Sequence, residues 1–397
     1  MKQKYTVIVL KSITSAIILL LFSYVVTNIG FELSGESDLI KKTNSIKSLI
    51  MSDEGPVPDS ILFVNICYDK ELVDVNDEDG FLKGQIDITN RQALYDFLEL
   101  LAEKADYKYV LMDVFFEEGI SSNADSVLFA KISSMDRIVI PKHRDTTLAG
   151  DSKLEEKSSF SDYTTTLLGN DFNKYELLDG EEKSMALTMY EDITGNTIDK
   201  YGPFYFDSYS ICNRTLFSKQ MILFNTPYDK NGEKNYYHLT TDLLQDPEGT
   251  QALIKGKYIF VGDMELDDIH DTVQGELPGS VITANTFIAL MNGKHKIPIY
   301  VIIILFTIYF FFSYSIFSHH SMSEILVNKI EKKYPKLLTP FSVNLLSWIS
   351  YSLILSCICL FFYYTLYISY DIFLTATFLQ GIDYIVSKFF LNKQKTS

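Results

Sequence analysis

The sequence lacks the short motifs that mark the common serine hydrolases, metalloproteases and thiol redox proteins. Among its 397 residues there is no Gly-x-Ser-x-Gly, no His-Glu-x-x-His and no Cys-x-x-Cys segment. Histidine is scarce, with six residues, and tryptophan occurs once. These absences argue against an enzyme, and we expect neither catalytic residues nor a bound cofactor.

Cysteine is also scarce, with four residues. Cys67 and Cys212 lie in the long middle part of the chain, whereas Cys357 and Cys359 lie in an apolar run near the C-terminus. An oxidising compartment would permit a Cys67–Cys212 disulfide. The alternative is two small buried thiols, which the apolar strand pattern that ends at Cys67 favours.

Long apolar runs are abundant. A hydrocarbon core needs about 20 apolar residues to be crossed, and four runs have roughly this length: residues 12–29, 297–317, 345–369 and 372–390. We therefore predict four transmembrane helices. The first run is too long for the apolar part of a signal peptide, and no small-x-small cleavage pattern follows it, so we expect it to remain as an anchor.

The positions of the lysines predict the orientation in the membrane. The N-terminus (1–11), the loop 318–344 and the tail 391–397 carry lysines, and short lysine-rich segments stay on the cytoplasmic side. Residues 30–296 are then predicted to lie outside the cytoplasm. We expect a multi-pass protein of a bacterial-type inner membrane with a large periplasmic domain.

The predicted outer domain is strongly acidic. The chain has a net charge of −16, and the segments outside 30–296 contribute ten lysines and four acidic residues, which leaves about −22 on the domain. This charge excludes nucleic acid as a partner held by charge attraction. It would attract cations or basic ligands, although simple solubility at a cell surface explains it equally well.

The pattern of the outer domain alternates strands and helices. Short apolar runs predict buried strands at 61–67, 109–113, 137–141 and 257–261. Segments with helical periodicity separate them, which predicts an α/β fold with a mostly parallel sheet and flanking helices. Residues 146–245 follow this pattern poorly, and we predict an insertion of mixed structure there with one strand at Met221–Asn225.

The last predicted helix of the domain, 279–291, carries apolar residues on one face: Val281, Ala284, Ile288 and Met291. Gly293 is predicted to end this helix. Only Lys294-His295-Lys296 separates it from the second apolar run. Such a short tether would pass a shift of the helix to the membrane span, or it is merely a compact exit from the domain.

Three blocks of the outer domain carry a resemblance to a known family. They are Ile86–Arg91 (IDITNR); Tyr109–Phe116 (YVLMDVFF), followed by Asp125; and Tyr258–Asp263 (YIFVGD) with Asp268–Thr272, Gly275, Leu277–Gly279 and Ala284-Asn285. The chain resembles the CHASE family of extracellular sensory domains, class two, which occurs with cyclases and histidine kinases. Two features depart from the family pattern, because Cys67 stands where an acidic residue is frequent and no Trp-Pro-Trp stretch precedes the arginine.

The resemblance implies an extracellular sensor with an undefined ligand. It marks as motif positions Arg91, Gly262, Thr272, Pro278, Gly279 and Asn285. Members of the family commonly carry a cytoplasmic output module, whereas this sequence continues for only seven residues after the fourth apolar run. We therefore expect the output protein to be a separate chain.

Ligands of parallel α/β sheets gather beyond the carboxyl ends of the strands. Asp113 ends one predicted strand and Asp263 follows another, and Asp268, His270 and Asp271 lie in the next loop. We predict that these five side chains line one crevice. Carboxylates with an imidazole could hold a divalent cation or a cationic ligand, or they cap neighbouring helices. The presence of a metal stays open.

Three further positions have two interpretations each. The amides of Gly279-Ser280 could bind an anion at a helix start, or Pro278 and Gly279 simply suit a tight turn into the helix. Arg91 stands in a first helical turn, where the helix dipole disfavours it, so it pairs with an internal carboxylate or is solvated. Asp383 is costly in hydrocarbon. It hydrogen-bonds across the bundle or to the spans of a partner, or it reaches the interface.

These features predict a membrane-anchored sensory domain that detects an unknown signal and passes it through its transmembrane helices. The alternative is a non-signalling envelope scaffold that binds another protein through the outer domain. The expected partners are the lipid bilayer and an output protein, and a homo-oligomer is compatible with the sequence.

Overall fold

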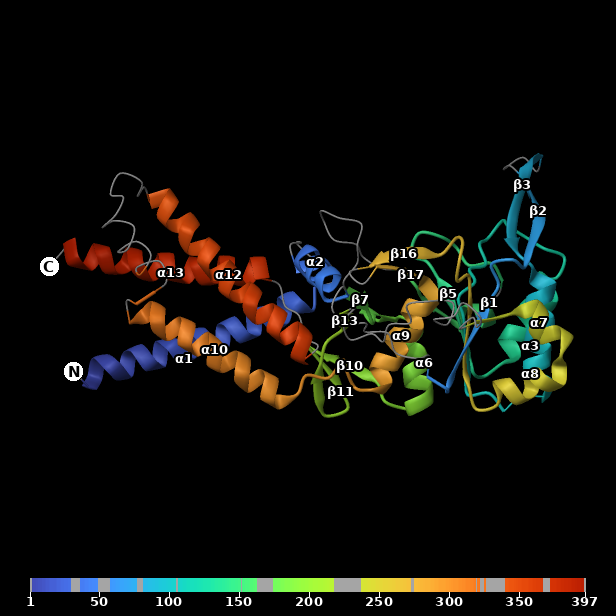
Figure 1. Cartoon of the computed structure of the whole chain (residues 1–397), viewed down its shortest axis with the longest axis horizontal. Coiled ribbons are helices and arrows are strands. Elements are labelled where there is room, and N and C mark those ends of the chain that lie inside the picture. Colours follow the sequence, from blue (N-terminus) through green and yellow to red (C-terminus); the bar gives the residue numbers. More distant parts are fainter. Residues whose placement is uncertain are drawn as a thin grey trace.

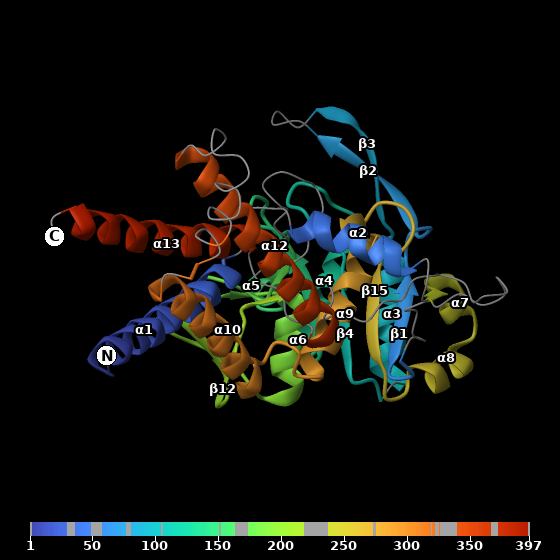
Figure 2. The same ribbon diagram turned by 60° about the vertical axis from the view of Figure 1, so that its left-hand side comes forward.

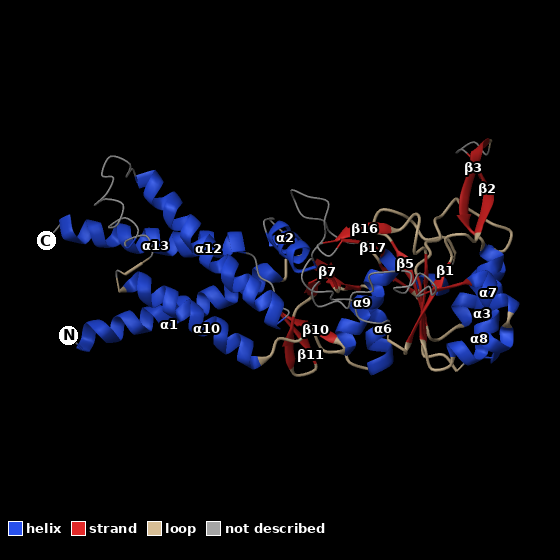
Figure 3. Cartoon of the chain, in the orientation of Figure 1, coloured by secondary structure: helices blue, strands red, loops and turns tan. Residues whose placement is uncertain are grey.

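The computed structural model describes residues 2–29, 36–48, 58–76, 81–104, 106–150, 152–162, 174–217, 237–272, 275–318, 320–321, 325, 340–366 and 372–395. Long helices form a bundle at one end of the molecule, and a mixed α/β domain lies at the other end (Figures 1 and 3). The N- and C-terminal ends of the chain lie together at the far end of the bundle (Figure 1).

The core of the domain is a six-stranded sheet in which every paired neighbour is parallel. Its strands, in spatial order, are β14 (Tyr237–Leu239), β1 (Ile61–Asn65), β15 (Tyr258–Gly262), β4 (Tyr109–Met112), β5 (Ile138–Lys142) and β6 (Ser158–Phe160). The predicted parallel sheet is confirmed. The four predicted strands correspond to β1, β4, β5 and β15, with ends that shift by one or two residues.

Helices cover both faces of the sheet and give the domain three layers. One face packs against α3 (Arg91–Lys104), α4 (Asp125–Ser134), α5 (Ser152–Glu155), α7 (Thr240–Gln245) and α8 (Pro247–Ile254). The other face packs against α6 (Met185–Thr194) and α9 (Gly279–Met291). Figure 1 shows α6 and α9 on the side of the sheet that faces the bundle.

Polar side chains make hydrogen bonds at the starts of α3 and α4. Asn90 precedes α3 and its side-chain oxygen accepts a hydrogen bond from the Ala93 amide at 2.9 Å. Before α4, the Asp125 carboxylate accepts from the Ser122 amide at 2.8 Å. The Asn90 cap satisfies a backbone donor that α3 itself leaves unpaired, whereas Ala124, the N-cap residue of α4, makes no side-chain cap.

The described residues of 146–245, where we predicted an insertion of mixed structure, contribute directly to the core of the domain. They supply β6 and β14 at the two edges of the sheet and α6 against one face. β6 and β14 have three residues each, too few for a clear apolar pattern. The predicted strand Met221–Asn225 lies outside the described residues.

The domain also contains short antiparallel strands outside the six-stranded sheet. They are the hairpins β2 (Lys70–Asn76)–β3 (Leu82–Thr89), β8 (Leu178–Asp179)–β9 (Glu182–Lys183) and β16 (Ile269–Thr272)–β17 (Gly275–Pro278), the pair β7 (Lys174–Glu176)–β13 (Thr215–Phe217), and the triplet β10 (Ile198–Tyr201)–β11 (Phe204–Asp207)–β12 (Ser210–Cys212). β10 and β11 lie next to the bundle, whereas β2–β3 projects at the opposite end (Figure 1).

Three helices in the described part of the chain are long and apolar enough to cross a membrane. They are residues Tyr5–Thr27 of α1 (Lys2–Thr27), α10 (Ile299–Phe317) and residues Asn344–Thr365 of α12 (Pro340–Leu366). A further long helix, α13 (Ile372–Lys395), packs beside α12, as Figure 2 shows from a second direction. Most of the predicted basic loop 318–344, including its four lysines, lies outside the described residues.

Asp383 lies inside this bundle and is 2% exposed. Tyr351 of α12 donates a hydrogen bond to its carboxylate at 3.1 Å. The interpretation that Asp383 hydrogen-bonds across the bundle is therefore confirmed. At the domain end of the bundle, Tyr364 of α12 donates to Asn44 of the surface helix α2 (Glu36–Ser48) at 2.9 Å.

Helix α9 differs from the predicted one-faced helix. Residues 280–290 are all buried, whereas Met291 is 41% exposed. The helix is enclosed because it packs between β15, β17 and α6. Gly293 follows its end with φ +67°, as predicted for a residue that terminates a helix.

The four cysteines are free, and Cys67 and Cys212 are both buried. The structure thus agrees with the interpretation of two buried thiols. Burial raises the pKa of Cys67 to about 11 and that of Cys212 to about 12, so both thiols stay protonated near neutral pH.

Candidate functional site: a crevice at the carboxyl edge of the sheet

A crevice of about 310 Å³ lies beyond the carboxyl ends of β4, β5 and β6, against the start of α9. Its lining residues are Asp113, Phe115, Pro141, His143, Ser161, Asp162, Tyr175, Asp268, His270, Gly279, Ile282 and Thr283. The position is the one that parallel α/β sheets use for ligands. The volume lies at the lower end of the range of small-molecule sites.

Asp113 supplies the most perturbed carboxylate of the crevice. It follows β4, and its backbone amide donates to Val261 of β15 at 2.7 Å, which places the residue at the centre of the sheet edge. Burial, with a further contribution from the negative charge of Asp268, raises the pKa of Asp113 to about 8. A carboxyl group with this pKa binds a proton at neutral pH and releases it when a cation takes its place.

Asp268 stands at the N-terminus of α9. Its backbone carbonyl accepts from the Gly279 amide at 2.9 Å, and His270 Nε2 lies 2.7 Å from its side-chain oxygen Oδ1. A Cβ atom at position 279 would lie 2.2 Å from Asp268 Oδ2, so only glycine leaves room for this carboxylate. The carboxylate therefore occupies the place that the sequence interpretation offered to an anion at this helix start.

A second histidine–aspartate pair forms the opposite wall. His143 Nδ1 lies 2.8 Å from Asp162 Oδ1, and the ring of Phe115 meets the His143 ring edge-on at 4.6 Å between centroids. Tyr175, from β7, is 5% exposed and adds an aromatic wall. Burial raises the pKa of the Tyr175 hydroxyl above its ordinary value.

Gly262 allows α9 to approach the sheet closely. A Cβ atom there would lie 2.8 Å from Ser280 Cβ and 3.3 Å from Asp113 Cβ. A larger residue would push the start of α9 away from the end of β15. The motif glycines 262 and 279 thus both serve the packing of α9 against the crevice.

Of the five predicted crevice residues, the structure brings together Asp113, Asp268 and His270. Asp263 is not in the lining, because its Oδ1 accepts from the amides of Glu265 and Leu266 at 2.9 and 2.8 Å and so shapes a loop. Asp271 is not in the lining either. It lies opposite Glu276 in the β16–β17 hairpin, where the sequence interpretation expected a loop, and it is exposed.

The remaining motif positions support the fold around the crevice. Thr272 donates to the Gly275 carbonyl at 2.7 Å and closes the β16–β17 hairpin. Pro278 precedes the first turn of α9. Asn285 is fully buried in α9, where its side-chain amide donates to the Val281 carbonyl at 2.8 Å.

Arg91 lies away from the crevice and is 3% exposed. Its guanidinium lies 3.5 Å from Asp125 and 4.4 Å from the centre of the Phe116 ring. The interpretation of an internal partner for Arg91 is confirmed. Burial lowers the pKa of Arg91 from its ordinary value, with Asp125 acting in the opposite direction.

Sequence interpretation missed four important members of the crevice: Phe115, His143, Asp162 and Tyr175. His143 follows the predicted strand 137–141, so the rule that found Asp113 applies to it too. Asp162 follows β6 and Tyr175 lies in β7, and neither strand gave a clear sequence signal.

Three aspartates and two histidines line the crevice. Each histidine lies beside one aspartate, and Asp113 adds a third carboxyl group to the lining. Among the described residues, no three histidine, cysteine, aspartate or glutamate side chains lie close enough together to hold a metal ion. Negative charge beside aromatic rings is the chemistry that binds an organic ammonium group.

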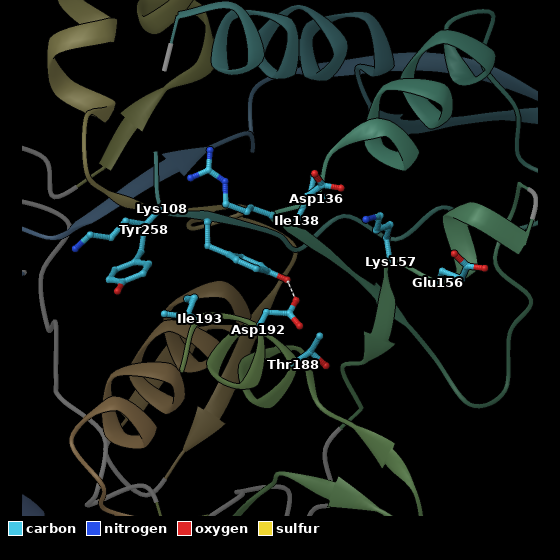
Figure 4. Close-up of a pocket in the computed structure, with 11 residues that line it drawn as sticks. Lys108, Asp136, Ile138, Glu156, Lys157, Thr188, Asp192, Ile193 and Tyr258 are labelled. Carbon is cyan, nitrogen blue, oxygen red and sulfur yellow. Dashed lines mark hydrogen bonds between the residues drawn. The ribbon is translucent and has the colours of Figure 1, made fainter. Parts of the chain in front are cut away.

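A larger cavity of about 720 Å³ lies at the opposite, amino edge of the sheet, between β4, β5 and α6. Figure 4 shows its labelled side chains and the hydrogen bond from the Tyr109 hydroxyl to Asp192, which measures 2.6 Å. Two of its three basic side chains already have aromatic partners, because Lys108 stacks on Tyr258 and Arg137 on Tyr107. Of the two, the smaller crevice is the candidate functional site, because Asp113 and the start of α9 line it.

Comparison with known proteins adds no relative, because no family model, no curated protein and no solved structure matches this chain. The fold and the site therefore define a class only in physical terms. The chain combines helices that can cross a membrane with a three-layer parallel α/β domain whose carboxyl edge carries an acidic crevice.

Proposed function

We propose that this protein is a membrane-anchored sensor whose outer domain binds a small organic cation in the carboxyl-edge crevice. The single observation that supports it best is the course of α9. Gly279, Ile282 and Thr283 at its start line the crevice, and its end leads within a few residues into α10. A ligand that moves α9 acts directly on a helix that can cross the membrane.

The tether between α9 and α10 is held firmly. His295 is fully buried, with Nε2 2.6 Å from Asp207 Oδ2, and Lys296 Nζ lies 3.2 Å from the same oxygen. Backbone hydrogen bonds join the tether to β12, from Asn213 to His295 and from Ile297 to Ile211, each 2.9 Å long. This geometry supports transmission of a shift from α9 to α10, and the alternative is that the tether is merely a compact exit from the domain.

Helix α1 is bound to the same strand. The Tyr24 hydroxyl donates to the Cys212 carbonyl at 2.9 Å, and Asn28 accepts from the Arg214 amide at 2.7 Å. A movement of the segment 211–214 therefore reaches α1 and α10 together. These two helices also pack along each other.

In this proposal α13 is a fourth span, and the outer domain lies in the periplasm of a bacterial-type cell whose inner membrane holds the bundle. The common location of both chain ends (Figure 1) supports an even number of crossings. The output is a separate protein that contacts the bundle or the basic loop. The resemblance to class two of the CHASE family agrees with this role.

The ligand part of the proposal is tested by thermal shift of the full chain in detergent with a panel of primary amines, polyamines and quaternary ammonium ions. We expect one class to stabilise the wild-type protein. Asp268→Asn should abolish that shift, whereas Asp271→Asn, on the same hairpin but exposed, should keep it. A stabilising amine that shifts both variants equally would place the ligand elsewhere, and a panel without effect would refute a cationic ligand.

The signalling part is tested separately by gentle solubilisation of native membranes, capture of the chain and identification of its partners by mass spectrometry. A co-purifying kinase, cyclase or transcription regulator is the expected result. Recovery of envelope or transport components alone would contradict a sensor and favour a scaffold.

One observation favours the scaffold as a second candidate. The hairpin β2–β3 projects from the domain at the end far from the bundle (Figure 1). Three apolar side chains in or next to its strands are exposed: Leu72 by 65%, Phe81 by 72% and Leu82 by 62%. Exposed apolar side chains on a projecting hairpin are typical of a protein contact. Loss of a captured partner on Leu72→Asp, with the amine response intact, would assign that contact to the hairpin.

A further inference from the structure

A separate cavity lies where the outer domain meets α1 and α10, and the proposed function does not use it. Its volume is about 250 Å³. Three parts of the chain form its wall, namely the domain end of α1, the start of α10 and the strands β11 and β12. The lining residues are Leu20, Leu21, Ser23, Tyr24, Thr27, Phe204, Ile211, Asn213, Ile297, Val301, Ile302 and Leu305.

The wall of this cavity is mostly hydrocarbon, and three of its four polar side chains make hydrogen bonds to the protein. Ser23 donates to the Leu20 carbonyl at 3.0 Å, and the Tyr24 hydroxyl donates to Cys212 at 2.9 Å. The side-chain oxygen of Asn213 accepts from the Asn28 amide at 3.1 Å. An occupant therefore finds apolar contact here and no need for a polar group.

The location of the cavity indicates what kind of molecule can occupy it. α1 and α10 are two of the helices that can cross a membrane, and the cavity lies at the ends of both that adjoin the outer domain. Leu21 is 44% exposed, so the wall opens sideways from α1. An apolar cavity does not hold water well, whereas the surrounding bilayer presents hydrocarbon chains at this depth.

We propose that this cavity binds one acyl chain of a lipid in the membrane leaflet next to the outer domain. The acyl chain would contact α1, α10, Phe204 and Ile211 at the same time. These contacts adjoin the Tyr24 hydroxyl, which links α1 to β12. Bound lipid would thus stabilise the junction through which α1 and α10 are attached to the domain.

The cavity recognises the acyl chain of the lipid and not its headgroup. Lys296, the cation beside the cavity, is already paired with Asp207 at 3.2 Å. The dispersion energy gained when methylene groups fill an apolar void supplies the affinity. Phosphatidylcholine and phosphatidylglycerol with the same chains should therefore bind alike.

The test uses the full chain in phosphatidylcholine nanodiscs that contain a phospholipid with a diazirine on its acyl chain. After illumination, peptides are analysed by mass spectrometry. We expect crosslinks to concentrate on the residues that line the cavity. Leu21→Trp, which fills it, should reduce these crosslinks at least fivefold. Ile17→Trp, one turn away on α1 and 46% exposed, should leave them unchanged.

A second pair of variants tests the same prediction from α10, in case Leu21→Trp fails to fold. Ile302→Trp fills the cavity from α10, whereas Ile303→Trp adds the same side chain at a neighbouring position outside the lining, which is 58% exposed. Crosslinks to α12 serve as the internal standard. Equal labelling in the filling and control variants, uniform labelling around α1, or a strong dependence on the headgroup would overturn the proposal.

Discussion

His295 Nε2 lies 2.6 Å from Asp207 Oδ2, and both side chains are fully buried between the domain and the start of α10. The Tyr190 hydroxyl donates to the same aspartate oxygen at 2.7 Å. One buried carboxylate therefore holds the tether, a helix of the core layer and the strand β11 together. This junction attaches the domain to the start of α10.

Asp207→Asn should destabilise the protein markedly. The substitution removes the negative charge that Lys296 and His295 face and leaves their donors buried with a weaker acceptor, which costs about 3 kcal/mol. Thermal unfolding of the detergent-solubilised chain measures this loss. Asp199→Asn, on the exposed part of β10 in the same strand triplet, is the matched control and should unfold like wild type. Equal unfolding temperatures for both variants would remove Asp207 from this role.

The stability of the junction should fall in acid. Burial lowers the pKa of His295 from its ordinary value, an effect that Asp207 opposes. The unfolded chain, with an ordinary histidine pKa of about 6.5, then binds the proton more readily than the folded chain. The contribution of His295 is present above pH 6.5 and is lost as the pH falls below it. Unfolding curves between pH 7.5 and 5 should converge for wild type and His295→Gln, and parallel curves would contradict the assignment.

Asp113 should have the opposite dependence on pH. Its folded pKa of about 8 lies above the unfolded value of 3.8, so the folded state binds the proton more tightly between these values. Stability contributed by this group therefore falls as the pH rises from 4 to 8, by at most about 1.4 kcal/mol per pH unit. Asp113→Asn should flatten the measured slope, whereas Asp271→Asn should retain it. The affinity for a cation should rise over the same interval, since the proton no longer competes.

The main elements of the sheet could be predicted because they obey a simple pattern. The strands that form β1, β4 and β15 are continuous apolar runs, as expected of strands buried on both faces. β6 and β14 are too short to show such a pattern, and they join the sheet through tertiary packing. The burial of α9 on all sides also depends on α6, whose position no local pattern in the sequence records.

The site could be predicted only in part for a related reason. Asp113 follows a clear strand, so its place at the sheet edge could be inferred. Asp268 and His270 reach the crevice through the β16–β17 hairpin, which has no apolar alternation to predict it. Asp263 was expected in the crevice because it also follows a strand, but its carboxylate is taken by two loop amides.

Gly279→Ala should change the stability of the protein in the direction opposite to that of an ordinary glycine-to-alanine substitution in a helix. Alanine ordinarily stabilises a helix relative to glycine by about 1 kcal/mol. Here the added Cβ would lie 2.2 Å from Asp268 Oδ2, so the carboxylate or the start of α9 must move. We expect a loss of stability of about 1–3 kcal/mol and at least a tenfold weaker amine response.

Gly84→Ala is the control for this change. Its Cβ would meet nothing within 4 Å, so this variant should keep both the stability and the amine response of wild type. A stabilised Gly279→Ala variant with intact ligand binding would show that Asp268 does not need its position against α9.

Substitution of Arg91 tests whether its buried ion pair with Asp125 stabilises the fold, or whether each charge only compensates for the burial of the other. Arg91→Met leaves the carboxylate of Asp125 without its cation and should cost about 3 kcal/mol. The double variant Arg91→Met/Asp125→Asn removes both charges and keeps an oxygen that accepts from the Ser122 amide, a contact of 2.8 Å in the wild type. We expect the double variant to be more stable than Arg91→Met alone, as measured by unfolding of the solubilised chain. If the loss of stability in the double variant equals the sum of the losses in the two single variants, Arg91 acts through its stacking on Phe116 rather than through its charge.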